Sequence, residues 1–222
     1  MLYSLEAVKA NIRNRDGKRV FYLGSCDQLT CEARDYLNQE RIEILPGHMA
    51  KPEQYRLLSG GYMQEKPEYM THLCGDILVP KTHPRIRFRG AIDNLEAQLL
   101  LCGESPQLQQ ILDLARRLIR CDVLNEPVGE FTLGGLTEQQ QRQHSHFPQE
   151  YYGQPHFMPA YSDGETLLRL NCARCAARNA ELAAVQAFSD GEGHLIREDI
   201  VKALNRMSSM LYILMIREKT KQ

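Results

Sequence analysis

The sequence predicts a mainly α-helical protein: an antiparallel bundle of four or five helices with a small N-terminal strand–helix–strand appendage. From about residue 85 onward, apolar residues recur every three or four positions in long segments, which is the period of helices that pack on a core. Short polar breaks separate these segments, and such breaks favour antiparallel neighbours. Before residue 46 the pattern is shorter and partly β-like.

These patterns divide the chain into three parts. Residues 1–46 are expected to form a small α+β accessory segment. Residues 47–70 contain prolines, the Gly60-Gly61 pair and little periodicity, so we predict a linker or loop. Residues 71–222 are expected to form the helical-bundle domain.

The accessory segment is too small to bury a core of its own, so it should pack on something larger. Its expected elements are an amphipathic helix over residues 1–15, a strand over 19–23, a helix over 30–39 capped by Thr30, and a strand over 42–45.

The boundaries of the bundle helices follow from capping and breaking residues. Ser105-Pro106 begins the second helix, and Thr137 with Gln140 three residues later predicts a capping box. The expected helices cover residues 86–102, 106–124, a short stretch after 137, 164–188 and 197–219.

Composition excludes several classes of protein. The formal net charge of −1 over 222 residues provides no global field that would recruit nucleic acid. There is no apolar run of about 18 residues, so we expect no membrane span, and the first residues lack the apolar core of a secretory signal. Seven cysteines, an odd number, indicate a reducing cytoplasm in which most thiols are buried and inert.

A cationic stretch precedes the first bundle helix. It contains Lys81, Arg85, Gly90 and Asp93, and Pro84 suits the first turn of a helix. A cationic loop that leads into a helix N-terminus is suited to an anionic ligand such as a triphosphate. The alternative is a solvated basic loop before a surface helix.

The third long helix places Arg174, Arg178 and Glu181 on one face. Their alanine, leucine and cysteine neighbours indicate that the arginines are half-buried, either in a salt-bridge ladder or as a pair that grips phosphates. The last helix is apolar almost all round and has a polar strip that includes Asn205 and Tyr212. These polar groups either bond to neighbouring helices or face a ligand.

Cysteines and histidines raise a third possibility, a metal site. Cys172 and Cys175 have redox-like spacing, but they lie mid-helix and no second pair has the spacing of a zinc site, so we interpret them as small core residues. His144, His146 and His156 lie close together in sequence, but histidines are common in loops. No residue is therefore assigned as a metal ligand.

Four motifs in order resemble one family, the helical-bundle ATP:cob(I)alamin adenosyltransferases. Its members have a lysine and an arginine before a G-x-V-D-E-L helix, an F-x-x-P-G-G loop, an R-T-x-x-R-R-A-E helix and an N-R-L-S-D stretch. The matching residues here are Lys81, Arg85, Gly90, Asp93, Phe157, Pro159, Arg174, Arg178, Glu181 and the run 205–208.

Three departures from the family pattern point to its ethanolamine-utilisation branch: Asn94 after the aspartate, the Pro159-Ala160-Tyr161 turn and Ser209. Segments 71–73 and 122–127 also resemble that branch. Some of its members hold a divalent metal with a His and Cys cluster before the Thr-His-Leu segment. Here residues 46–70 contain His48 and no cysteine, which argues against bound iron or zinc.

The resemblance implies transfer of the 5′-deoxyadenosyl group of ATP to the Co(I) of a reduced corrinoid, which makes adenosylcobalamin for an ethanolamine ammonia-lyase. It implies that Arg178, Arg174 and Asp93 are the catalytic residues, with Asp93 paired to Arg174. It also implies that Phe157 crowds the lower face of the corrinoid. The residues implied to bind ATP, with Mg²⁺ between the phosphates, are Lys81, Arg85, Arg178, Glu181 and Asn205.

The resemblance also implies a homotrimer with ATP sites between subunits, a reductase partner, and a cytoplasmic location that includes a bacterial microcompartment as one alternative. Two other functions compete with the transferase: a non-catalytic corrinoid chaperone or scaffold of the same fold, and a plain metal-binding protein.

Overall fold

The computed structural model describes residues 2–15, 17–47, 54–190 and 192–221. Its contacts divide the chain into two compact units, Met1–Lys81 and Thr82–Gln222. The division therefore falls just after Lys81, the first cation of the cationic stretch, whereas we expected the bundle domain to begin at residue 71.

The first unit begins with the predicted strand–helix–strand piece. Strands β3 and β5 are parallel and are joined through α2, whose N-cap Thr30 accepts a hydrogen bond from the N–H of Ala33. The elements of this region are β1 (Leu2–Tyr3), α1 (Leu5–Asn11), β2 (Arg13–Arg15), β3 (Lys18–Leu23), β4 (Gln28–Leu29), α2 (Cys31–Gln39) and β5 (Glu43–Pro46).

One prediction in this region is wrong in extent. The first helix ends at Asn11 rather than near residue 15, because Arg13–Arg15 forms β2 and pairs antiparallel with β3. The polar side chains of this short strand do not alternate with apolar ones, so its sequence carried no strand signal.

The prediction of a linker or loop over residues 47–70 is also wrong for its described part, which contains two short strands. A sheet of order β7-β6-β9-β8 occupies the end of the first unit. The Gly60-Gly61 pair forms the tight turn between β6 and β7, and both glycines have positive φ. Residues 48–53 of the predicted linker, with His48, lie outside the described residues. The strands are β6 (Tyr55–Leu57), β7 (Tyr62–Met63), β8 (Met70–Cys74) and β9 (Ile77–Pro80).

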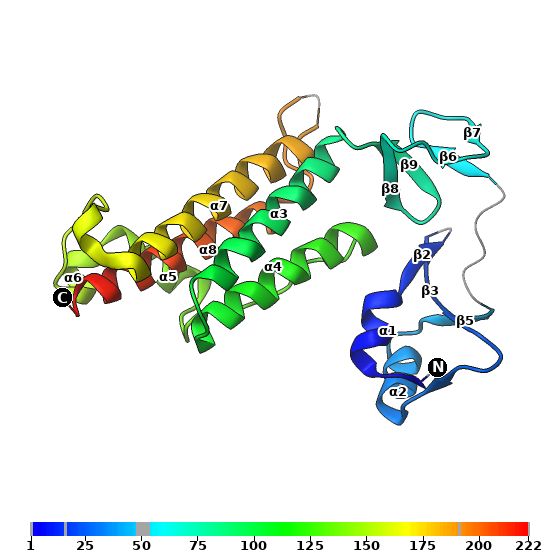
Figure 1. Cartoon of the computed structure of the whole chain (residues 1–222), viewed down its shortest axis with the longest axis horizontal. Coiled ribbons are helices and arrows are strands. Elements are labelled where there is room, and N and C mark those ends of the chain that lie inside the picture. Colours follow the sequence, from blue (N-terminus) through cyan, green and yellow to red (C-terminus); the bar gives the residue numbers. More distant parts are fainter. Residues whose placement is uncertain (1, 16, 48–53, 191, 222) are drawn as a thin grey trace. The chain divides into compact units, whose positions relative to one another are not determined.

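The second unit is helical, and its four long helices match the predicted ones. Helices α3, α7 and α8 pack side by side, with α7 in contact with both of the others (Figure 1). Thr137 and Gln140 form the predicted capping box at the start of α5. The helices are α3 (Pro84–Leu101), α4 (Pro106–Leu124), α5 (Glu138–His146), α6 (Pro148–Tyr152), the 3₁₀ turn η1 (Tyr161–Asp163), α7 (Gly164–Phe188) and α8 (Glu198–Lys219).

Alanines on the buried side of α7 allow this packing. With only a methyl group at each contact, the neighbouring helices approach closely. The alanines are Ala173, Ala176, Ala177, Ala180 and Ala184, each at most 3% exposed. Apolar side chains of α3, α4 and α8 pack in the same core.

Helices α3 and α7 run antiparallel. Phe88 near the start of α3 packs edge-on against Phe188 at the end of α7, and Arg169 near the start of α7 donates to the carbonyl of Leu101 at the end of α3. Within the described ranges, no helix is both long and apolar enough to cross a membrane.

Candidate functional site

The cationic stretch leads into a helix N-terminus, as the sequence predicted. Lys81 is exposed and follows β9 at the end of the first unit. His83 caps α3 through Nδ1, which accepts the N–H of Arg85 at 3.2 Å. Partial burial, followed by the charges of Arg85 and Arg89, lowers the pKa of His83, and Asp122 acts in the opposite direction. His83 is thus held neutral, as its acceptor role requires.

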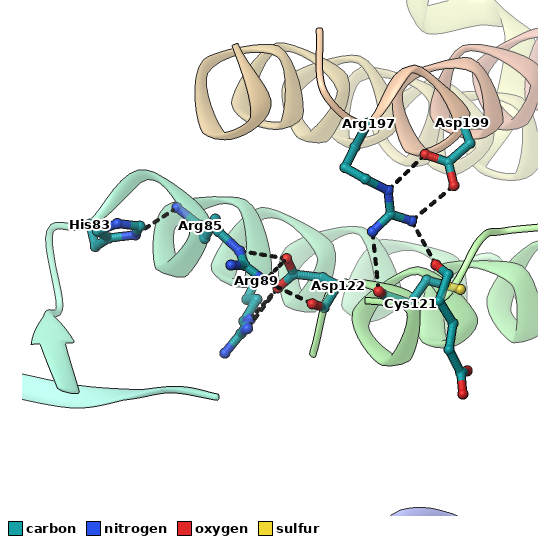
Figure 2. Close-up of polar contacts among 8 residues, drawn as sticks. His83, Arg85, Arg89, Cys121, Asp122, Arg197 and Asp199 are labelled. Carbon is teal, nitrogen blue, oxygen red and sulfur yellow. Dashed lines mark hydrogen bonds and ion pairs between the residues drawn. The ribbon is translucent and has the colours of Figure 1, made fainter. Parts of the chain in front are cut away.

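Arg85 and Arg89 converge on a single carboxylate (Figure 2). Nε of Arg85 donates to Oδ1 of Asp122 at 2.7 Å, and Nε of Arg89 donates to Oδ2 at the same distance. Nη2 of Arg85 also donates to the backbone carbonyl of Asp122 at 2.7 Å. The Asp122 side chain is fully buried, whereas those of Arg85 and Arg89 are 26% and 17% exposed.

A second ion pair supports the same end of α4. Arg197, just before α8, donates to both oxygens of Asp199 and to the carbonyls of Cys121 and Glu126 (Figure 2). Burial opposes ionisation of Asp199, but the hydrogen bonds from Arg197 and from the N–H of Val128 outweigh it, so the pKa of Asp199 is lowered. The guanidinium of Arg197 thus ties the last turn of α4 and the loop that follows it to the start of α8.

On α7 the three predicted residues differ in their surroundings. Arg174 is half-buried and donates to Oδ1 of Asn171, while Arg178 is exposed. Glu181 accepts a hydrogen bond of 2.8 Å from Nδ2 of Asn205 on α8, so two predicted ATP ligands meet directly. The Oδ1 of Asn205 accepts from the buried Arg206, and this fixes the orientation of the amide.

Tyr212 connects the predicted catalytic residue Arg174 to the predicted corrinoid residue Phe157. The guanidinium carbon of Arg174 lies 5.8 Å from the centre of the Tyr212 ring, and the Phe157 ring stacks on the same tyrosine at 6.0 Å. The tyrosine hydroxyl bonds to Nδ1 of His156 at 3.0 Å. The cationic side chain of Arg174 and the apolar ring of Phe157 therefore both pack on Tyr212.

The loop that carries Phe157 is tied down at both ends. At its start, Nε2 of His156 lies 3.2 Å from the carbonyl oxygen of His146. At its end, the buried Asp163 pairs with Lys219 and accepts the N–H of Ala160. Between these ties, Met158 is 88% exposed.

The structure does not join all the predicted residues. Asp93 is exposed, and among the described residues its side chain has no hydrogen bond or ion pair, so it does not pair with Arg174 within this chain. Arg178 likewise has no such partner in the described ranges, and Lys81 belongs to the other unit.

Two expectations about cysteine are wrong. Cys172 and Cys175 are exposed rather than in the core, because they lie on the side of α7 opposite its buried alanines. Only one of the seven thiols, Cys121, is buried. Over the described residues no group of three potential ligands could hold a metal ion. His144 and His156 bond to Tyr152 and Tyr212.

Sequence reasoning missed Arg89 and Asp122 as site residues. Arg89 lies four residues after Arg85, which places both side chains on one side of α3, and this spacing was a usable signal. Nothing in the local sequence around Asp122 identifies its partners, because they lie 37 and 33 residues away.

Comparison with known proteins points to the same family as the sequence motifs. A family model described as cobalamin adenosyltransferase matches residues 61–218. The corrinoid adenosyltransferase EutT of Escherichia coli K12 is 35% identical over 164 residues, which cover 71% of this chain and 61% of the relative. EutT of Salmonella typhimurium LT2 is 35% identical over 158 residues, which cover 68% and 59%.

The matched region includes α3, α4, α7 and most of α8, and thus all the contacts around Asp122, Asn205 and Tyr212. The chain spans about three fifths of the length of these relatives. From the family-model match over most of its length, the chain belongs to the cobalamin adenosyltransferase family.

Proposed function

We propose that the protein transfers the 5′-deoxyadenosyl group of ATP to the Co(I) of a reduced corrinoid and so makes adenosylcobalamin. The cobalt electron pair forms a Co–C bond at C5′ while the C5′–O bond breaks, and the triphosphate leaves with the electrons of that bond. The corrinoid supplies the nucleophile. The tasks of the protein are to align cobalt with C5′ and to stabilise the negative charge on the leaving group.

The contact chain from Arg174 through Tyr212 to Phe157 is the observation that supports this proposal most directly. The reaction needs a cationic region for phosphates beside an apolar region for a corrinoid. One tyrosine in contact with both kinds of side chain is suited to that requirement, because it fixes the spacing between the two binding regions.

For the triphosphate we propose Lys81, Arg85, Arg178 and Asn205 as ligands. Arginine and lysine supply charge-assisted hydrogen bonds to phosphate oxygens. Glu181 takes the role of orienting Asn205, through the 2.8 Å hydrogen bond to its amide. Mg²⁺ enters as the complex with ATP, since phosphate oxygens are ligands that it prefers, and we assign it no protein ligand.

For the corrinoid we propose Phe157 as the ring at its lower face. An apolar ring there excludes water and a lower axial ligand, which makes Co(II) easier to reduce. Phe157 is half-buried on Tyr212, and its loop is held at His156 and Asp163. A separate reductase delivers the electron to cobalt.

We further propose a homotrimer in which neighbouring subunits complete the ATP site. Asp93 is exposed and Arg174 has charge available, so the pair that is absent within the chain forms between copies. An outward line on α7 supports such an interface, since it places apolar and small side chains beside Arg178 and Glu181. The line consists of Leu168, Cys172, Cys175 and Leu182.

The biological setting that we propose follows the named relatives. The product would serve an ethanolamine ammonia-lyase in the cytoplasm, with association with a bacterial microcompartment as a further proposal. The first unit, Met1–Lys81, is assigned no catalytic residue except Lys81.

An absorbance assay tests the activity. Purified, metal-analysed protein is mixed with chemically reduced cobalamin and MgATP, and the spectrum of adenosylcobalamin is followed. We expect product without bound iron or zinc. Binding of ATP and cobalamin without product would instead support a corrinoid chaperone, and binding of neither would refute both.

A further inference from the structure

The carboxylate of Asp122 lies at a position where three parts of the second unit meet. It comes from the last turn of α4, receives Arg85 and Arg89 from the first two turns of α3, and lies near the Arg197–Asp199 pair at the start of α8 (Figure 2). Its side chain has no exposed surface, and each oxygen is 2.7 Å from a guanidinium nitrogen. A buried carboxylate with two arginines is fully paired.

Arg85 is held on several sides at once. Nε and Nη2 bind the carboxylate and backbone carbonyl of Asp122, and the guanidinium carbon lies 6.0 Å from the centre of the Phe188 ring. Across the described parts of the chain, Nη1 of Arg85 makes no hydrogen bond, and the side chain remains 26% exposed. One edge of a fixed guanidinium is therefore available to a ligand.

The charges of this cluster do not cancel. Two guanidinium groups and one carboxylate leave a net charge of about +1, and the neutral His83 beside them adds none. An ion pair that only stabilised the fold would need one arginine for one carboxylate. The second arginine makes the cluster a fixed cation, which suits a ligand that brings negative charge.

We infer that Asp122 is a positioning residue for the triphosphate of ATP. It holds Arg85 in the orientation that presents Nη1 to a phosphate oxygen, and Arg89 keeps the cluster positive. The inference rests on the proposed function, because the anion is taken to be ATP. This pre-organisation favours ATP binding, because a long arginine side chain that is already fixed loses little conformational entropy when the phosphate binds.

The test compares Asp122→Asn with Arg85→Ala and the double variant, measured as KM for ATP in turnover and as Kd for MgATP by calorimetry. We expect each single variant to raise both constants roughly tenfold, as for one charge-assisted hydrogen bond. The double variant should be no worse than Arg85→Ala alone, because Asp122 acts through Arg85. The KM for cobalamin should stay within about twofold.

The matched control is Asp199→Asn, which changes the neighbouring, partly buried ion pair at the same end of α4. It should lower the unfolding temperature but leave the KM for ATP unchanged. An equal rise in KM in this variant would overturn the inference, as would additive effects in the double variant or an Asp122→Asn variant that binds ATP normally.

If Asp122→Asn does not fold, Arg89→Gln is the alternative variant, because it changes a partly exposed member of the same cluster. It should also raise the Kd for MgATP, and a Kd within about twofold of wild type would overturn the inference. Calorimetry separates this inference from the proposed function. A wild-type chain that binds MgATP without forming adenosylcobalamin refutes the transferase but still tests Asp122.

Discussion

The arginines of this protein differ mainly in which neighbouring groups already bind them and offset their positive charge. Arg85 shares the charge of Asp122, and Arg174 donates to Asn171 and lies over Tyr212. Arg178 is exposed, and the described part of the chain offers it no hydrogen-bonding or ion-pairing partner. Because a phosphate gains most from a cation that no carboxylate has neutralised, Arg178 should contribute more to ATP binding than Arg85.

The first prediction concerns this order. Arg178→Ala should lower kcat/KM for ATP roughly a hundredfold, against about tenfold for Arg85→Ala. Steady-state kinetics with MgATP measures both values. Asn179→Ala, at the next exposed position of α7, is the control and should change neither kinetics nor stability. Wild-type kcat/KM in Arg178→Ala would remove this residue from the site.

The second prediction concerns His83, whose pKa is lowered from the usual 6.5. The unfolded chain binds the proton more readily, so the contribution of His83 to stability is complete above about pH 6.5 and is lost as the pH falls through the lowered folded-state pKa. His83→Asn keeps a capping oxygen that does not titrate. Its unfolding temperature should therefore fall less than that of wild type between about pH 7.5 and 5.5.

Other histidines with lowered pKa, His72 and His144, remain in both proteins and cancel in this comparison. Thermal unfolding followed by circular dichroism across the pH series is the measurement. Parallel curves for the two proteins would show that protonation of His83 does not weaken the start of α3.

At the scale of elements, the C-terminal end of α4 depends on a side chain from another part of the chain. Asn125, in the left-handed conformation, ends the helix, and Arg197 then binds the carbonyls of Cys121 and Glu126. The side chain of Arg197 is 13% exposed. Its removal would take the side-chain donor from both carbonyls and the counter-charge from the Asp199 carboxylate.

The third prediction is that Arg197→Met lowers the free energy of unfolding of the second unit by about 3 kcal/mol. Denaturant titration followed by circular dichroism measures this. Arg116→Met is the comparison, because Arg116 of α4 is more exposed and pairs with Glu96 of α3 without binding any backbone carbonyl that is described, and the expected loss there is below about 1 kcal/mol. Equal losses in the two variants would contradict a capping role for Arg197.

Capping chemistry explains which elements could be predicted. Ser105, Pro106 and the Thr137 capping box marked helix starts correctly, since a cap is local in sequence. The strands β2 and β6 to β9 could not be predicted in this way, because short strands depend on partners elsewhere in the chain. The Gly60-Gly61 pair was interpreted as a loop signal, but it forms a hairpin turn.

The same distinction applies to the candidate site. Spacings of three and four placed Arg174, Arg178 and Glu181 on one face of a helix, and this needed no tertiary information. The contacts of Asp122 with α3 and of Asn205 with Glu181 depend on how the helices pack. Asn205 could therefore be picked out from the sequence, but the partner of neither residue could be predicted from it.

At the scale of the whole molecule, part of the outward line on α7 is not covered by the described residues. Leu182, six residues before the end of this helix at Phe188, is 68% exposed. An exposed leucine on a long helix indicates a contact with another chain more strongly when small and apolar neighbours extend the surface.

The fourth prediction is that Leu182→Arg converts the proposed trimer to smaller species and lowers turnover, while the helix content stays the same. A buried arginine without a partner disfavours the interface. Light scattering coupled to size exclusion measures the mass. Ile196→Arg is the control, since Ile196 is 71% exposed but lies in the turn before α8. If both variants keep the wild-type mass, α7 does not form the interface.

The alanine face of α7 has a consequence for mutational tolerance. An alanine codon changes by one nucleotide to valine, threonine, serine, proline, glycine, aspartate or glutamate. At Ala177 or Ala180, fully enclosed between helices, most of these replacements add volume or charge where there is room only for a methyl group. Inactivating alleles should therefore accumulate at residues that touch neither substrate. A map of loss-of-function variants would then mark the alanines between the helices as clearly as the residues of the binding site.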